Sequence, residues 1–171
     1  MISMRNLYKF ALAGILICGI PVGASAQMTD YFREIPESLL PTLSVNNRLD
    51  MLDFMASNMK AVVINRLGGK SEMTLLTDST LTIRMSNALQ VDMLLLKTTA
   101  ATEADADREV ICLIETFGSD SLSRESTVRF FTDSWTLLKE PPLLSVSDQN
   151  IISSKKVQTI LKRDDEILKK N

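Results

Sequence analysis

The chain contains no histidine, and this absence limits the chemistry that its other polar residues can perform. Histidine is the usual general base near neutral pH and the commonest metal ligand. Catalysis would have to depend on carboxylates, because paired Asp or Glu side chains can hydrolyse glycosidic bonds without histidine. Asp50 and Asp53 are three residues apart and would share a helix face. Other carboxylates considered for such a role are Asp78, Asp92 and Glu115.

An acidic segment between two apolar stretches carries alternating carboxylates at Glu103, Asp105, Asp107 and Glu109. Carboxylate oxygens are the ligands that calcium prefers. However, the segment lacks the glycine of an EF-hand loop, and its intervening alanines supply no side-chain oxygen. We therefore expect a solvated hairpin loop rather than a metal site, and we expect no cofactor.

Two further motifs that could carry chemistry have simpler structural interpretations. Cys112 lies in the apolar run Val110–Ile114, and a reactive thiol needs a nearby base or cation to lower its pKa. We expect a buried, unreactive thiol. The Gly68–Ser71 segment resembles the end of a phosphate-binding loop but lacks the upstream glycine, so we expect a tight turn. The sequence has no Gly-x-Ser-x-Gly nucleophile motif.

Aromatic residues concentrate at Phe130, Phe131 and Trp135. Successive residues of a strand point to opposite faces, so one of the two phenylalanines could be exposed. Exposed aromatic side chains bind sugars or protein partners. Phe131 and Trp135 are therefore the candidate binding residues, together with the segment 141–152, and core packing is the alternative.

The first 26 residues have the pattern of a secretory signal peptide. Arg5 and Lys9 precede an apolar run from Phe10 to Ile20, and Ala24–Ala26 forms a small-x-small cleavage site. The apolar run is shorter than the roughly 20 residues of a membrane-spanning helix. We expect cleavage before Gln27 and a periplasmic or secreted protein. Lipidation at Cys18 is disfavoured because Ile17, rather than a small residue, precedes it.

The composition of the mature chain is that of one anionic domain. Removing 26 of 171 residues leaves 145, enough for a single core without disulfides. The 19 basic residues fall to 17 against 21 acidic ones, a net charge of −4. No basic block remains, so nucleic acid is not an expected partner. No second long apolar stretch remains to span a membrane.

The apolar periodicity predicts an α+β fold in which N-terminal helices pack on an antiparallel β-meander of five to seven strands. A short helical turn is expected near Pro36. The segment 46–59 predicts a helix with Asn47 as N-cap. Its apolar stripe at helical spacing should face the sheet. This stripe comprises Leu49, Met51, Leu52, Phe54, Met55, Ala56 and Met59.

The following segments alternate with a period of two, which favours strands joined by short turns. The segment 61–64 is β-branched and favours a strand, although it could also extend the helix. The predicted strands are 61–64, 73–76, 80–85, 89–95, 109–117, 126–131 and a short last one at 135–138. The domain organisation is therefore a signal peptide at 1–26, one domain at 27–140 and an extension at 141–171. In the extension, 143–152 could dock as an extended segment, and 155–170 has weak helical spacing.

Several sequence motifs together resemble a family of uncharacterised exported proteins from gut-type Gram-negative anaerobes, classified as a domain of unknown function. They are Pro36–Pro41, Asn46–Phe54, Met59–Ala61, Asn65–Met73, Leu76–Asp78, Val110–Thr116, Phe130–Phe131 and Trp135. The resemblance implies a location in a Gram-negative envelope. It implies no activity and no catalytic residue.

The leading functional hypothesis is a non-enzymatic exported module that binds an envelope protein, since an antiparallel sheet offers edges for strand addition. One alternative is a carboxylate-dependent hydrolase of envelope sugars or peptides. Another is a carrier of a small hydrophobic ligand, which would need an apolar cavity of roughly 300 Å³ or more between helix and sheet.

The export hypothesis predicts the mass of the mature protein. Because the small residues Ala24 and Ala26 define the cleavage site, we expect a mature chain that begins at Gln27. Intact-mass spectrometry of the protein from a secreting host tests this. A diacylglyceryl adduct on Cys18, or an uncleaved N-terminus, would contradict it.

Overall fold

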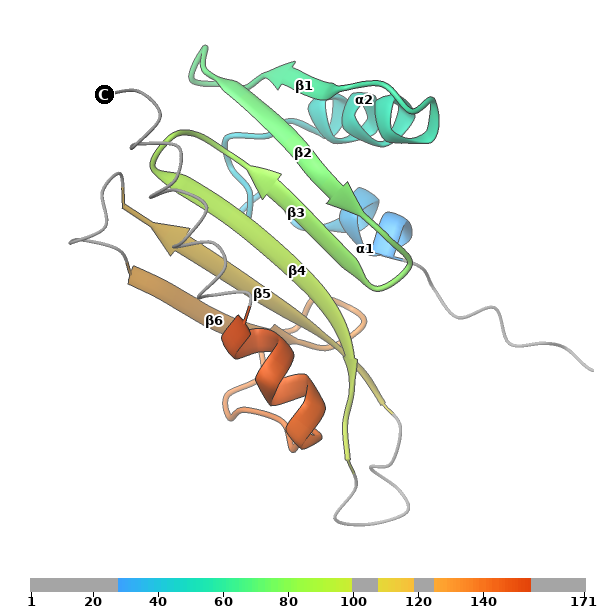
Figure 1. The fold of residues 1–171 in the computed structure, drawn as a ribbon, viewed down its shortest axis with the longest axis vertical. Helices are drawn as coiled ribbons and strands as arrows, with labels where there is room; N and C mark the ends of the chain where they lie inside the picture. Colours follow the sequence, from blue (N-terminus) through green and yellow to red (C-terminus); the bar gives the residue numbers. More distant parts are fainter. Residues whose placement is uncertain (1–27, 100–107, 119–124, 155–171) are drawn as a thin grey trace, which may run out of the picture.

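The computed structural model describes residues 28–99, 108–118 and 125–154 of the chain. Within them, six antiparallel strands form one sheet in sequence order, as Figure 1 shows. The predicted α+β class and β-meander are confirmed. The strands are β1 Ala61–Ile64, β2 Lys70–Leu76, β3 Thr80–Arg84, β4 Leu89–Lys97, β5 Glu109–Phe117 and β6 Glu125–Phe131.

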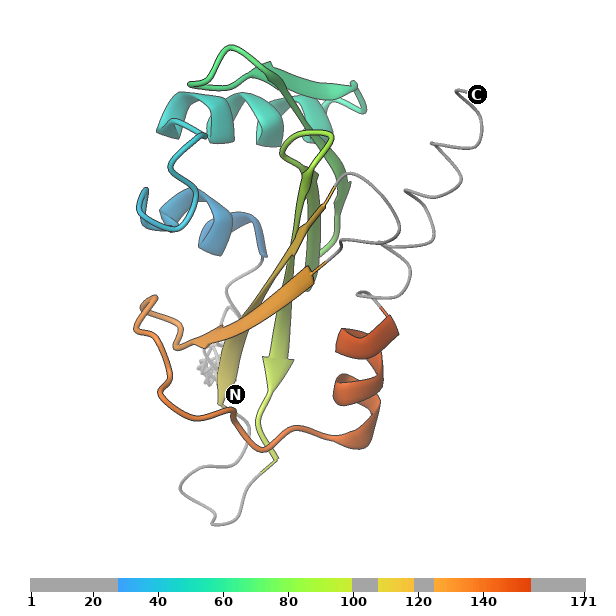
Figure 2. The ribbon, with the colours of Figure 1, turned by 90° about the vertical axis from the view of Figure 1, so that its left-hand side faces the viewer.

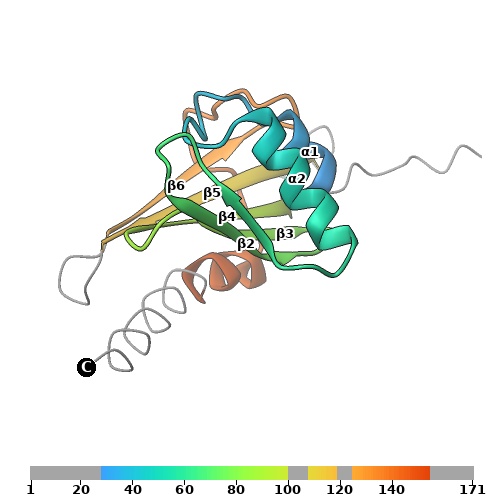
Figure 3. The ribbon, with the colours of Figure 1, turned by 90° about the horizontal axis from the view of Figure 1, so that it is seen from above.

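Helices lie on both faces of this sheet. The helices α1 (Met28–Glu34) and α2 (Val45–Ala56) cover one face, which we call face 1. A third helix, residues 146–154, lies against the opposite face, which we call face 2. Figure 3 shows the same separation from above. The sheet is therefore a middle layer between two unequal helical covers.

The larger core lies on face 1, where α1 and α2 meet the alternate side chains of all six strands. Met28 and Phe32 of α1 are completely buried, as is Met51 of α2. The sheet contributes side chains such as Ile83 of β3 and Met93 of β4. This packing explains the period of two in the strand sequences.

A smaller core on face 2 explains why β5 reads as an almost continuous apolar run. Leu94, Cys112 and Ile114 are buried there, and Leu144 and Ile152 from the C-terminal segment pack against them. A strand covered on both faces has no solvated side to carry polar residues. The expectation that Cys112 is a buried thiol is confirmed.

The start of α2 differs from the sequence prediction. Ser44, not Asn47, is the N-cap, because the Ser44 hydroxyl accepts a hydrogen bond from the Asn47 amide at 3.1 Å. The Asn47 side chain in turn accepts from the Ser44 amide at 3.1 Å, which completes a capping box. The helix ends at Ala56, earlier than predicted, where Asn58 adopts a left-handed conformation with φ 54°.

The C-terminal segment also differs from its prediction. Residues 146–154 are helical, although 143–152 was expected to be extended. Ser145 caps this helix, since its hydroxyl accepts from the Asp148 amide at 3.1 Å. The predicted strand at 135–138 is reduced to one bridge between Phe131 and Leu137.

None of the helices in the described residues has the length and hydropathy that a membrane-spanning helix requires. The predicted signal peptide, Cys18 and the segment 155–170, for which the sequence spacing suggested a helix, lie outside the described residues.

Burial of Cys112 predicts that the free energy of unfolding falls at alkaline pH. Burial, with a smaller contribution from the charge of Asp92, raises the pKa of the Cys112 thiol to about 12. An unfolded thiol ionises near pH 8.5, so stability contributed by the neutral thiol is lost as pH rises from about 8.5 towards 12. We expect the free energy of unfolding of Cys112→Val to fall less steeply than that of wild type between pH 8.5 and 11. Urea unfolding across this range tests it, and equal slopes would contradict it.

Candidate functional site: the outer edge of β6 and the strap

After β6 the chain forms a strap, residues 132–144, which passes from face 1 around one end of the sheet to face 2 (Figure 2). Its first part pairs with the outer edge of β6. The Leu138 amide donates to the Phe130 carbonyl at 2.8 Å, and the Thr132 amide donates to the Thr136 carbonyl at 2.9 Å. The strap thus occupies the outer edge of β6 at its C-terminal end.

The second part of the strap covers the end of β4. The Thr99 amide donates to the Leu143 carbonyl at 2.8 Å, and Thr98 forms a β-bridge with Leu144. β3 pairs with β4 only as far as Leu94, so the strap replaces β3 beyond that point. It therefore hydrogen-bonds to β6 and to the residues that directly follow β4, a strand that is not adjacent to β6 in the sheet.

A pocket of about 580 Å³ lies between the strap and the ends of β4 and β5. Its walls are mixed in character, with threonine hydroxyls, charged groups and aliphatic side chains. They are formed by Thr98, Thr99, Arg108, Glu109, Val110, Thr132, Asp133, Leu138, Pro142 and Leu143. This pocket lies at the end of the sheet. The hypothesis of a hydrophobic-ligand carrier instead required a cavity between helix and sheet.

Glu109, which lines this pocket, forms a hydrogen bond with a residue of α1. The Tyr31 hydroxyl donates to Glu109 Oε2 at 3.1 Å. Burial raises the pKa of Tyr31 to about 12, and the hydrogen bond and charge of Glu109 and the charge of Asp133 add to this. The contact joins α1 to the start of β5, so Glu109 has a structural role.

The carboxylates proposed for hydrolysis are not brought together. Asp92 pairs with Ile114 and Val91 pairs with Glu115, so Asp92 and Glu115 point to opposite faces of the sheet. Asp92 is buried and accepts a hydrogen bond from Thr82 at 2.6 Å. Asp50 and Asp53 are exposed on α2, and Asp78 is exposed in the turn after β2. None of these five lines the strap pocket.

The remaining sequence motifs have structural roles or lie elsewhere. Gly68 adopts φ 77° in the turn between β1 and β2, which confirms the predicted tight turn. Of the acidic segment, residues 103–107 lie outside the described residues. Among the described residues, no group of three or more Asp, Glu or Cys side chains could hold a metal ion.

The outer edge of β6 is open over a short stretch before the strap begins. Phe130 and Thr132 direct backbone groups towards the strap. Successive residues of a strand direct their N–H and C=O groups to opposite sides of it. Ser126 and Val128 therefore direct theirs to the same outer side of β6 as Phe130. No hydrogen-bond partner for these four groups is found in the described part of the chain. We call them the open edge.

The other sheet edge, formed by β1, is partly blocked by local hydrogen bonds. The Asn65 backbone amide donates to the Gly69 carbonyl at 2.8 Å, on the side of β1 that faces β2. Successive residues of a strand direct their backbone groups to opposite sides, so those of Val62 and Ile64 point outward. The Val62 amide donates to the Lys60 carbonyl at 3.0 Å. The Asn47 side chain donates to the Ile64 carbonyl at 3.1 Å. These bonds block two of the four outward groups of this short strand.

The open edge is flanked on face 1 by a fixed cation. Arg129 donates to Glu115 Oε2 at 2.6 Å and lies over the Phe131 ring, 5.7 Å from its centroid. The Arg129 side chain is 35% exposed. Thr127 and Glu125 on the same face of β6 are exposed. A chain that added at this edge would therefore meet a positioned guanidinium.

The two predicted binding residues lie at the other end of β6. Phe131 is 3% exposed and belongs to the face 1 core, which leaves almost no surface for a partner. Trp135, in the strap, is partly buried against the Phe131 ring, with centroids 5.6 Å apart. Trp135 has φ 61°, and its buried indole N–H has no acceptor in the described residues.

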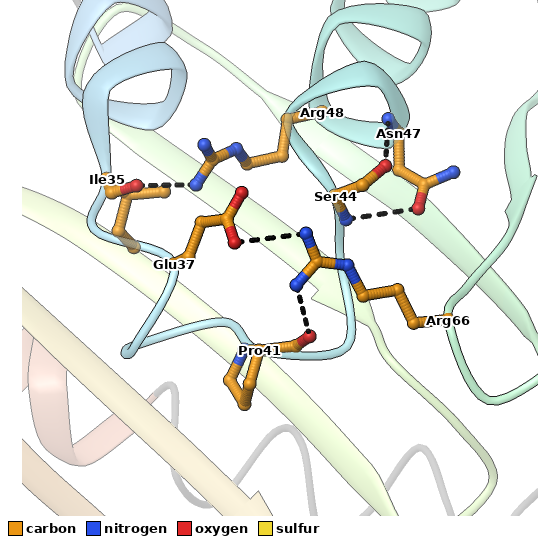
Figure 4. Close-up of polar contacts among 7 residues, drawn as sticks. All are labelled: Ile35, Glu37, Pro41, Ser44, Asn47, Arg48 and Arg66. Carbon is orange, nitrogen blue, oxygen red and sulfur yellow. Dashed lines mark hydrogen bonds and ion pairs between the residues drawn. The ribbon is translucent and has the colours of Figure 1, made fainter.

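Arg48 is a buried charge in α2 that no sequence pattern had indicated. The buried side of α2 is Arg48, Met51 and Leu52, whereas Leu49 and Met59 of the predicted stripe are 37% and 57% exposed. The Arg48 Nη1 donates to the Ile35 carbonyl (Figure 4). Its Nε is buried without an acceptor in the described residues.

A second arginine fixes the same loop from outside. Arg66 donates to the Pro41 carbonyl at 3.2 Å and to Glu37 Oε2 at 3.0 Å, as Figure 4 shows. Burial lowers the pKa of Arg48, while the charge of Glu37 opposes this. Because Arg48 is only 3% exposed, a solute cannot reach it without displacing the loop. We interpret the two arginines as a clip that holds residues 35–43 on the core.

Comparison with known proteins places the chain in a family. Residues 22–167 match the family model described as "Protein of unknown function (DUF3256)". The chain belongs to this family. The match confirms the resemblance to a domain of unknown function, and the family description names no activity. No curated protein matches the chain.

A solved structure shares the fold of this DUF3256 chain. It is described as "Structure of a domain of an uncharacterized protein from Porphyromonas gingivalis W83". The two agree with a TM-score of 0.52 and 23% sequence identity, over 65% of this chain and 52% of that chain. The match thus spans about half the length of the solved chain, and the likeness concerns the fold alone.

The clip predicts an order of stability among Arg48 variants. Arg48→Met keeps most of the packing and removes a desolvated charge, whereas Arg48→Lys keeps the charge but loses the reach to Ile35. We expect Arg48→Lys to lower the free energy of unfolding by about 2–4 kcal/mol and Arg48→Met by about half as much. Urea unfolding measures both. The matched exposed variant Arg66→Met should lose about 1 kcal/mol or less. A larger loss in Arg48→Met than in Arg48→Lys would contradict the interpretation.

Proposed function

We propose that this chain is an exported, non-enzymatic protein-binding module of the cell envelope that receives a strand of its partner at the open edge of β6. The observation that carries the proposal is the contrast between the two sheet edges. Local bonds to Val62 and Ile64 obstruct β1, whereas the groups of Ser126 and Val128 on β6 have no partner in the described residues. Unpaired edge groups are the template for strand addition.

The strap provides an internal example of such pairing. The segment around Leu138 already lies along β6 and bonds to Phe130. The edge therefore accepts an added chain in antiparallel orientation. A partner strand would continue this arrangement towards Ser126.

The side chains beside the open edge suggest the partner's pattern. On face 2 the partner would lie next to Val128, which packs against the smaller core, so an apolar residue fits there. On face 1 it would lie next to Arg129, so an acidic or polar residue fits there. The Phe131 ring packs against the Arg129 guanidinium, and Trp135 could extend the contact with the partner along the strap.

The fold is compatible with the export part of the proposal. Among the described residues, the face 1 core begins at Met28, whose side chain is 0% exposed and whose backbone amide donates to the Asp78 carbonyl at 2.9 Å. Cleavage before Gln27 would keep every described residue of this core. An extracytoplasmic protein with one buried cysteine also needs no disulfide.

A proline at the open edge should prevent partner binding without opening the sheet. Proline has no N–H, and edge strands tolerate it where that N–H points outward. A photo-crosslinking residue at the exposed position Thr127, in a secreting host, should form protein adducts. We expect Val128→Pro to reduce these adducts at least fivefold and Val128→Thr to leave them unchanged, as analysed by mass spectrometry.

Two controls make this test specific. The same crosslinker at Lys60, beside the partly blocked edge β1, should give few adducts. Circular dichroism should show that Val128→Pro retains its sheet, and Ser126→Pro is the second variant if it does not. Equal adducts at Thr127 and Lys60, or adducts that persist in both proline variants, would overturn the proposal.

A further inference from the structure

The sequence along the open edge is complementary to itself. On face 1, β6 presents Glu125, Thr127 and Arg129 in succession. In an antiparallel pairing of two β6 strands centred on Thr127, Glu125 of each copy lies opposite Arg129 of the other. Opposite charges directly across a strand pair attract, and paired threonines are also favourable.

The backbone groups of the open edge fit the same register. Centred on Thr127, Ser126 of one copy faces Val128 of the other, so all four groups of the open edge bond to the equivalent four of the second copy. A register centred on Val128 would place Ser126 opposite Phe130, whose carbonyl already accepts from Leu138. The strap thus blocks that shift.

We propose that the partner at the open edge is a second copy of this chain, in an antiparallel β6–β6 pairing with its two-fold axis at Thr127. This rests on the proposed function and names its partner. A two-fold axis perpendicular to the sheet keeps face 1 of both copies on one side. The two sheets then form one continuous twelve-stranded sheet from the six strands of each copy.

The Arg129 side chain is already positioned for this contact. Glu115 and the Phe131 ring hold its guanidinium on face 1. A guanidinium has five N–H donors, so it can bind a second carboxylate while it keeps the first. Glu125 is exposed and forms no ion pair within the described residues. In the dimer this carboxylate gains a partner.

The interface is small, so we expect a rapidly exchanging, concentration-dependent dimer rather than an obligate one. Glu125→Lys replaces two attractive cross-strand pairs with two repulsive ones. The dimer Kd should rise by roughly 5- to 30-fold. Sedimentation of the wild-type mature protein, which needs no variant, should show a monomer–dimer equilibrium.

A cysteine at Thr127 tests the register directly. Thr127 bonds inward to β5, so the two Thr127 residues form a non-hydrogen-bonded pair across the axis, with Cα atoms about 4.5 Å apart. This distance suits a disulfide. Mild oxidation of Thr127→Cys should give a disulfide-linked dimer, whereas Glu125→Cys should not, because its two copies are four residues out of register. Cys112 is buried and present in both.

The outcomes separate this inference from the proposed function. A Thr127→Cys dimer that Val128→Pro abolishes supports both. A wild-type protein that stays monomeric at millimolar concentration, or equal crosslinking of Thr127→Cys and Glu125→Cys, overturns the dimer. If Thr127 crosslinks to foreign proteins under those conditions, the proposed function stands and only its partner is wrong.

Discussion

The requirement that backbone hydrogen-bonding groups find partners shapes this protein more than any single side chain. A six-stranded open sheet has two edges, and each one must be paired, covered or left to a partner. Asn47 and the turn at Lys60 obstruct β1. The strap covers the end of β6 and the end of β4, where β3 stops. At Ser126 and Val128 all four outward backbone groups lack a partner among the described residues, so the pairing around them defines the site.

The two covers of the sheet keep this edge in place. The face 1 core ties α1 and α2 to every strand, and the Tyr31–Glu109 hydrogen bond fixes α1 to β5. The strap joins the two faces and brings Leu144 and Ile152 onto the smaller core. The charged groups that could suggest catalysis serve this construction: Arg48 secures a loop, and Asp92 bonds to Thr82.

Most strands were predictable because one covered face gives their sequences an apolar period of two. β5 was predictable because both of its faces are covered, which gives an almost continuous apolar run. The sequence also identified the Gly68 turn and the buried Cys112. Local pattern could not show that Arg48 lies inside, because its burial depends on the Ile35 carbonyl, thirteen residues away. The caps Ser44 and Ser145 were missed although each has a side-chain partner three residues on, the usual capping signal. The open edge depends on the strap's pairing with β6, which no local pattern encodes.

Amide hydrogen exchange along β6 tests the central claim most directly, since it reports the pairing of each backbone N–H in the wild-type protein. In dilute solution, the amides of Ser126 and Val128 should exchange orders of magnitude faster than those of Thr127 and Arg129, which bond inward to β5. Protection of Ser126 and Val128 should appear only as the protein concentration rises or a partner is added. Equal, strong protection of all four amides in the dilute protein would show that this edge is already paired, and would contradict the account.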